Sequence, residues 1–208
     1  MFDEAGLAIS PISSAVVRFS IGVMLMDSHE RNYIKGRGLF FCLIEVVTLL
    51  GAPVVSGGFM GLGRGKAGYR HYLKALIEEA EKASGHWIPV ALEAVNRYEL
   101  DYLQTPEETL DFVESTCCDN MKTLLDIFHI NIEEASIELA LRTCRQGERL
   151  THVHISESNR RMSGKEHLDF KPVCAVFSKF EYAGALSSEL EWMPVDEEEA
   201  VLDNSEIS

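Results

Sequence analysis

Apolar, strand-like runs alternate with helix-like segments along nearly the whole 208-residue chain. Strand–helix alternation of this kind predicts βαβ units that share one parallel sheet. The sequence therefore predicts an α/β fold, and a doubly wound open sheet is its simplest form. Six strands are expected, near residues 15–24, 52–57, 88–95, 120–127, 150–156 and 184–190.

Helix signals fall between these runs, as the alternation requires. The segment 33–51 has a helical pattern that ends at Gly51, a residue suited to a helix C-cap. Thr105, Pro106 and Glu108 together form a helix start with a capping box. The segments 68–84, 131–144 and 170–180 are also predicted helices. The glycine-rich stretch 58–65 lacks the lysine of a phosphate-binding loop and is predicted to be a loop.

Composition excludes several classes of function. The net charge is −14, from 33 acidic and 19 basic residues, and a surface this acidic repels nucleic acid and anionic membranes. No segment has the roughly 18 consecutive apolar residues of a membrane span. Five cysteines, an odd count without a CxxC pair, predict reduced thiols and a cytoplasmic protein.

The most informative polar residues stand where the last four predicted strands end. They are Glu93, Asp126, the pair His152 and His154, and Glu189. Because the carboxyl ends of parallel strands face one crevice, we expect these side chains to converge. Carboxylates with one imidazole suit a divalent cation such as Mn²⁺, Mg²⁺ or Co²⁺.

Each of these residues also has a structural interpretation. A glutamate after a strand is commonly a solvated loop residue, and a histidine in a strand is commonly a hydrogen-bonded core residue. The pattern over four successive strands favours the metal site. His152 and His154 point to the same face, and His154 lies nearer the crevice, so we expect His154 to be the ligand.

Four separated stretches resemble one known family. ALEAVNRYE, LLDIFHINIEE, HVHISESNRRMSGKEHLDF and YAGALSSELE are similar to motifs of the sugar isomerases and epimerases with a xylose-isomerase-like TIM barrel. The ketose 3-epimerases that act on D-tagatose, D-psicose and L-ribulose are the most similar members. The resemblance covers about residues 15–194 and implies a (β/α)₈ barrel.

The resemblance also implies a reaction and a set of roles. It implies a metal-dependent epimerase that inverts carbon 3 of a ketose by proton abstraction through an enediolate, with Mn²⁺ as the expected ion. Glu93 and Glu189 would be the acid–base pair, and which of them acts first depends on the configuration of the substrate. The implied metal ligands are Glu93, Asp126, His154 and Glu189, and the implied substrate-binding residues are Glu99, His129 and Arg160. Asn96 and Arg97 are expected to fix the loop between Glu93 and Glu99.

The chain departs from this family in its size. A (β/α)₈ barrel typically needs about 250 residues, so the first two strands are expected to be missing and about six βα units to remain. We expect one barrel domain over residues 1–208, with an N-terminal extension at 1–14 and an acidic tail at 195–208. Unpaired sheet edges favour association, and relatives suggest a homodimer or homotetramer.

Two other functions stay open beside the epimerase. The first is a non-catalytic remnant of the family that acts through association and not through turnover of a sugar. The second is a metal-dependent phosphodiesterase of the endonuclease IV type, which shares the barrel. The acidic surface and the single-ion ligand set argue against phosphodiester cleavage.

Overall fold

The computed structural model describes most of the chain between residues 6 and 191. The described residues are 6–7, 9–15, 20–25, 27, 29–52, 54–56, 78, 85, 88–146 and 148–191. Three predicted segments lie outside the described residues: the loop at 58–65, the helix at 68–84 and the tail at 195–208. The exception is Glu78 in the second segment, which is described and is helical.

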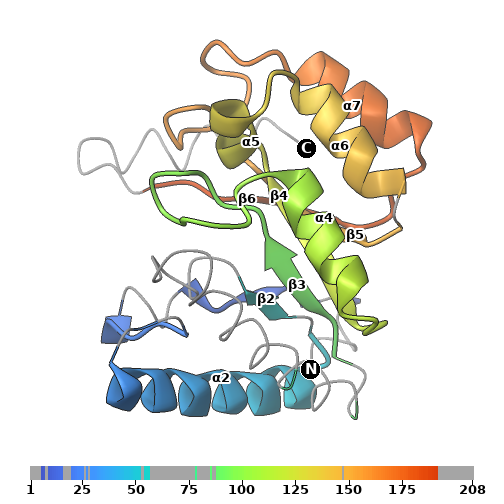
Figure 1. Ribbon diagram of the computed structural model, residues 1–208. Coiled ribbons are helices and arrows are strands. Elements are labelled where there is room, and N and C mark those ends of the chain that lie inside the picture. Colours follow the sequence, from blue (N-terminus) through green and yellow to red (C-terminus); the bar gives the residue numbers. More distant parts are fainter. Residues whose placement is uncertain are drawn as a thin grey trace.

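Six described strands form one parallel sheet (Figure 1). Each strand pairs with the next along the chain, in the order β1-β2-β3-β4-β5-β6. A doubly wound sheet reverses its strand order at a switch point, so this consecutive order favours the winding of a βα barrel. The strands are β1 (Ile12–Ser13), β2 (Val54–Ser56), β3 (Val90–Glu93), β4 (Met121–Asp126), β5 (Leu150–Ile155) and β6 (Ala185–Ser188).

The helices connect these strands and cover the sheet. In Figure 1, α6 and α7 lie side by side near one end of the molecule, and α2 runs along the opposite end. The described helices are α2 (Glu30–Leu50), α4 (Pro106–Ser115), α5 (Ile127–Glu133), α6 (Ile137–Gln146) and α7 (Phe170–Lys179). Within the described ranges, none of the helices combines the length and apolar character that crossing a bilayer takes.

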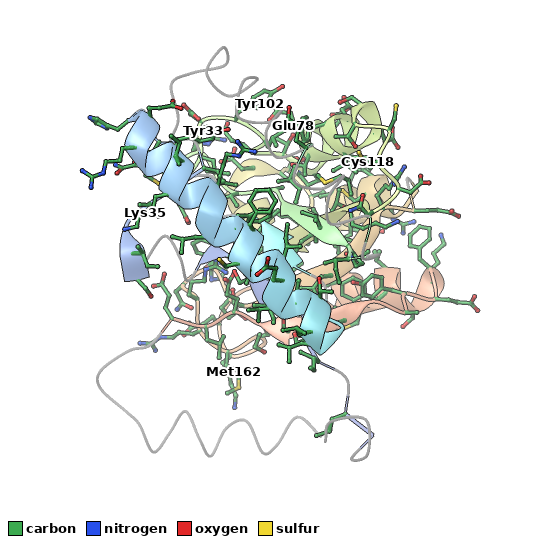
Figure 2. The ribbon with its side chains drawn as sticks, turned by 90° about the horizontal axis from the view of Figure 1, so that it is seen from below. Tyr33, Lys35, Glu78, Tyr102, Cys118 and Met162 are labelled. Atoms are coloured by element: carbon green, nitrogen blue, oxygen red, sulfur yellow. The ribbon has the colours of Figure 1, made fainter. Side chains whose placement is uncertain are left out.

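Two predicted helix ends are confirmed in detail. Gly51 ends α2 with φ 66°, a left-handed conformation that a residue without Cβ adopts easily. At the start of α4, the Thr105 side chain accepts a hydrogen bond from the Glu108 N–H at 3.2 Å, and Pro106 takes the first helical position. Figure 2 looks onto α2, whose residue Tyr33 is buried while Lys35 is exposed.

The prediction of a strand near 15–24 is wrong for the residues described there, which are 15 and 20–24, while residues 16–19 lie outside the described part of the chain. The first strand, Ile12–Ser13, precedes this run and lies within the stretch 1–14 that was expected to be an extension. Ala15, Ser20 and Ile21 are helical. A short apolar run fits a buried helix as well as a strand, because periodicity alone does not separate the two. That two further barrel strands are missing stays a prediction.

The predicted helix over 131–144 is in fact two helices. Glu134 leaves α5 with an extended backbone, and Ser136 starts α6 by accepting the Leu139 N–H on its side chain at 3.2 Å. A serine side chain competes with the helix for backbone donors, so it favours a new helix start at this position.

Along β3, β4 and β5, successive side chains point alternately to the helix-covered face of the sheet and to its inner face. Leu125 and Val153 belong to the apolar cluster that includes α4, α6 and α7 residues, and Leu92 belongs to the cluster that includes α2 residues. Strand side chains repeat every two positions, so the residues between these point to the other face of the sheet. That inner face carries the polar residues of the candidate site.

Candidate metal centre

The four strand-end residues are placed by strand alternation and by strand register. Glu93 and Asp126 are the last residues of β3 and β4, His154 is the second last of β5, and Glu189 directly follows β6. Asp126 lies opposite His154 in the β4–β5 pairing, and the Glu189 N–H extends the ladder by bonding the Ile155 carbonyl. All four therefore meet at the carboxyl end of the sheet.

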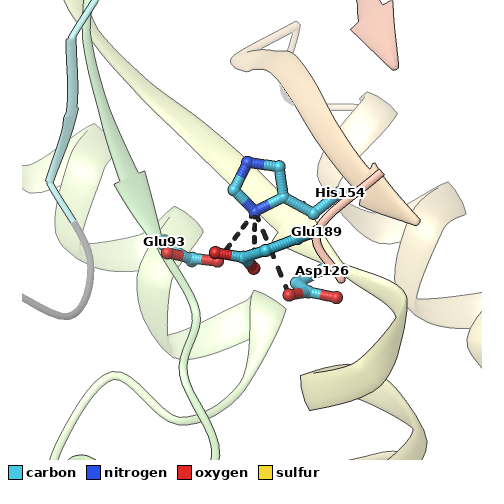
Figure 3. A group of neighbouring side chains, drawn as sticks. All are labelled: Glu93, Asp126, His154 and Glu189. Carbon is cyan, nitrogen blue, oxygen red and sulfur yellow. Dashed lines mark ion pairs between the residues drawn. The ribbon is translucent and has the colours of Figure 1, made fainter. Parts of the chain in front are cut away.

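One imidazole nitrogen faces all three carboxylates (Figure 3). His154 Nδ1 lies 3.1 Å from Glu189 Oε2, 3.3 Å from Glu93 Oε1 and 3.9 Å from Asp126 Oδ2. One possible ligand atom from each residue lies within 4.8 Å of the others. The predicted convergence is therefore confirmed, and the role of these residues as metal ligands stays a prediction.

Burial and mutual contact shift the pKa values of the four groups. Burial raises the pKa of Glu93, and it raises the pKa of Asp126 well above its ordinary value. Burial also disfavours the charged form of His154, but its contacts with Glu189 and Glu93 outweigh this and raise its pKa to about 10. Burial acts on Glu189 as well, yet His154 and Asp126 hold the pKa of Glu189 below its ordinary value.

The donor set fits a divalent cation. Three buried or half-buried carboxylates carry negative charge at one point, and charge of this kind is retained in proteins when a cation offsets it. Among the described residues, buried Glu93 Oε1 and His154 Nδ1 lie 3.3 Å apart in the group, and neither makes a hydrogen bond of normal geometry. Oxygen ligands with one nitrogen favour Mn²⁺ or Mg²⁺ over a structural zinc site with thiolates.

Arg160 lies directly beside the four residues. Its Nη1 bonds Glu189 Oε2 at 3.0 Å and also contacts Asp126 Oδ2, and its guanidinium stacks on the Phe128 ring at 4.0 Å. His129 Nε2 lies 3.2 Å from Arg160 Nη2. Two of the three predicted substrate-binding residues therefore adjoin the candidate metal ligands.

Glu99, the third predicted substrate-binding residue, joins this group through Asn96. Asn96 Nδ2 lies 2.7 Å from His129 Nδ1 and donates to Glu99 Oε1 at 3.4 Å. Arg97 instead points outward and forms a bidentate ion pair with Glu133. Asn96 and Arg97 thus both hold the 94–99 loop against α5, as the sequence predicted.

His152 lies on β5 two residues before the candidate ligand His154. It is only 1% exposed, its Nε2 lies 2.6 Å from Ser187 Oγ, and its ring packs edge-on against His154. Burial lowers the pKa of His152 to about 4, so its imidazole is neutral. His154, and not His152, therefore lies beside the three carboxylates, and its role as the ligand stays a prediction.

Glu157 is a structural residue of the site that was not predicted from the sequence. This side chain is fully buried, and its carboxylate accepts the backbone N–H groups of Gly164, Glu166 and Leu168. Its carbonyl accepts the Arg160 N–H, and Arg160 has φ 60°. Glu157 therefore fixes the loop from which Arg160 reaches the site. An acidic residue just after a strand was the only sequence signal.

Comparison with known proteins agrees with this geometry. A family model described as "Xylose isomerase-like TIM barrel" matches residues 1–207. L-ribulose 3-epimerase of Mesorhizobium japonicum is 39% identical over 115 residues, which are 55% of this chain and 38% of that protein. D-psicose 3-epimerase of Enterocloster bolteae is 36% identical over 113 residues, which are 54% of this chain and 36% of that protein.

The solved structures show the same fold over nearly the whole chain. A structure of L-ribulose 3-epimerase superposes with a TM-score of 0.77 and 26% identity, covering 98% of this chain and 68% of that chain. The match to the two curated relatives is shorter and spans 36–38% of their length.

Proposed function

Since the chain belongs to the xylose isomerase-like TIM barrel family, we propose that it is a metal-dependent epimerase that inverts carbon 3 of a ketose. One observation carries this proposal: Glu93, Asp126, His154 and Glu189 present ligand atoms within 4.8 Å of one another. Relatives named for L-ribulose and D-psicose support a ketose as the substrate class.

The same four residues would hold the metal ion, for which Mn²⁺ is the preferred candidate and Mg²⁺ or Co²⁺ are alternatives. When bound, a divalent ion supplies positive charge that offsets the negative charge developing beside the ketose carbonyl. Three carboxylates and one neutral imidazole would form the ligand set. His154 must therefore give up its proton when it acts as a ligand.

Glu93 and Glu189 are the proposed acid–base pair. They approach from β3 and from the end of β6, so they flank the centre of the site from separate strands. Burial raises the pKa of Glu93, whereas neighbouring His154 and Asp126 keep the pKa of Glu189 low despite its burial. The pKa values of the two glutamates are thus shifted in opposite directions, and separated pKa values suit a pair in which one group donates a proton and the other removes one.

Glu99, His129 and Arg160 are proposed to bind the oxygens of the ketose. Arg160 supplies a fixed positive charge that is held in place by Phe128 and by its ion pair with Glu189. Holding the substrate in this way places the carbon-bound proton near the glutamates, and such positioning contributes much of the rate enhancement of an enzyme.

Hydrogen exchange in deuterated water tests this function. The protein, stripped of metal and reloaded with Mn²⁺, is incubated with D-psicose or L-ribulose in D₂O, and deuterium at carbon 3 is followed by NMR. We expect deuterium incorporation together with the carbon-3 epimer. Glu93→Gln and Glu189→Gln variants serve as matched controls, because each keeps the side-chain size and removes one carboxylate. A bound ion without exchange on any ketose would refute the proposal.

Association without turnover is the second candidate function. Strand β6 lies at an edge of the described sheet, and Leu186 within it is 48% exposed. An exposed strand edge is a template for pairing with another chain. A defined dimer or tetramer in light scattering, combined with no exchange on any ketose, would favour this candidate over the epimerase.

A further inference from the structure

The orientation of the Asn96 amide is fixed by its neighbours. Asn96 is 1% exposed, and its Oδ1 accepts the backbone N–H of Tyr98 at 2.9 Å. A backbone N–H can only donate, so the oxygen must lie on that side of the amide. The Nδ2 group therefore faces His129 and Glu99.

This orientation determines which ring nitrogen of His129 carries the proton. Asn96 Nδ2 can only donate, and at 2.7 Å from His129 Nδ1 it requires a lone pair on that nitrogen. A neutral imidazole with a lone pair on Nδ1 carries its proton on Nε2. The lone pair on Nδ1 also means that the ring is neutral, because an imidazolium carries a proton on both nitrogens.

The Nε2 proton then points at a second donor. His129 Nε2 lies 3.2 Å from Arg160 Nη2, and a guanidinium has no acceptor. The two groups therefore cannot form a hydrogen bond with each other. The carboxylate oxygen Asp126 Oδ2 lies 3.9 Å from Nε2, which is beyond hydrogen-bond length. An oxygen atom from a ligand would satisfy both donors at once.

We infer that Asn96 is a positioning residue, which holds His129 as the Nε2–H tautomer so that His129 and Arg160 form a paired donor site for one ligand oxygen. The assignment of that oxygen to a ketose carbonyl or hydroxyl rests on the proposed function. The tautomer itself does not, because it follows from contacts within the protein.

Nitrogen-15 NMR of the histidine rings tests the tautomer directly. Metal-free protein is labelled at histidine, and the His129 signals are assigned by their loss in His129→Gln. We expect wild-type His129 to carry a proton on Nε2 and none on Nδ1. A proton on Nδ1 in the wild type would overturn the inference.

Asn96→Asp provides the matched perturbation. It keeps the size of the side chain and the acceptor for Tyr98 N–H, but it replaces the donor that faces His129 by an acceptor. We expect His129 Nδ1 to gain a proton in this variant. Asn120→Asp is the control, because it makes the same change at another buried amide, whose Nδ2 donates to the Ile88 carbonyl and not to His129. This variant should leave the His129 signals unchanged. An unchanged spectrum in Asn96→Asp would contradict the inference.

Ligand binding tests the donor pair separately. With diamagnetic Mg²⁺ bound, addition of D-psicose is expected to shift the His129 Nε2–H signal and leave Nδ1 without a proton. A protein with the expected tautomer but no exchange or shift with any ketose would refute the proposed function alone. A protein that turns over ketoses with Nδ1 protonated would refute the role of Asn96 alone.

Discussion

Metal binding is predicted to release a proton from His154. In the metal-free protein its contacts with Glu189 and Glu93 outweigh burial and raise its pKa to about 10, so His154 is protonated at pH 7. A histidine binds a metal ion through the lone pair of a neutral imidazole, so the ion has to displace this proton. Removing a proton at pH 7 from a group with a pKa of about 10 costs about 4 kcal/mol, because one pKa unit corresponds to about 1.4 kcal/mol.

The sign of the pH dependence follows from this cost. The free-energy cost of removing this proton falls by about 1.4 kcal/mol for each unit by which the pH rises. The Mn²⁺ affinity should therefore rise about tenfold per pH unit between about pH 7 and 9. At least one proton should be released per ion. The raised pKa of Asp126 would add to this number and not subtract from it.

Titration calorimetry in several buffers measures the proton count. The observed enthalpy of Mn²⁺ binding is plotted against the ionisation enthalpy of the buffer, and the slope gives the protons released. His152→Gln is the matched control, because burial lowers the pKa of His152 to about 4 and leaves no proton to release at neutral pH. Affinity that stays flat from pH 7 to 9, with no proton released, would refute the assignment of His154 as a protonated ligand.

Three further outcomes are expected. Folding raises the pKa of His154 from 6.5 to about 10, so protonated His154 stabilises the fold fully below pH 6.5 and this stabilisation is lost as the pH rises toward 10. The melting temperature of the metal-free wild type should therefore fall between pH 7 and 9, and it should fall more than that of His154→Gln. Glu93→Gln removes a buried carboxylate, so the melting temperature of the metal-free protein should stay the same or rise. Its Mn²⁺ affinity, measured from the thermal shift that Mn²⁺ produces, should fall about 100-fold or more. An unchanged thermal shift with Mn²⁺ would exclude Glu93 as a ligand. Glu157→Gln should lose an acceptor for buried loop N–H groups and cost about 1–3 kcal/mol in urea unfolding, and a cost near zero would show that the loop holds without it.

Much of the site could be predicted from strand alternation alone. The apolar runs before Glu93, Asp126 and His154 end at these residues, and a period of two residues places each on the face opposite Leu92, Leu125 or Val153. Parallel pairing then brings the strand ends together. No knowledge of side-chain packing is needed for this step.

Other features depend on contacts that no sequence pattern encodes. Arg160 reaches Asp126 and Glu189 because its loop turns through a left-handed residue and is held by the buried Glu157 carboxylate. The first strand was misplaced because residues 15–24 are apolar without a strand-specific period. For Arg160 the decisive interactions are tertiary and not local.

Anomalous diffraction from crystals grown with Mn²⁺ tests the central claim most directly. The account predicts one strong manganese peak per chain, coordinated by Glu93, Asp126, His154 and Glu189, and disappearance of this peak in Asp126→Asn. A map with no peak among these four side chains, or with its only strong peak elsewhere on the molecule, would contradict the account.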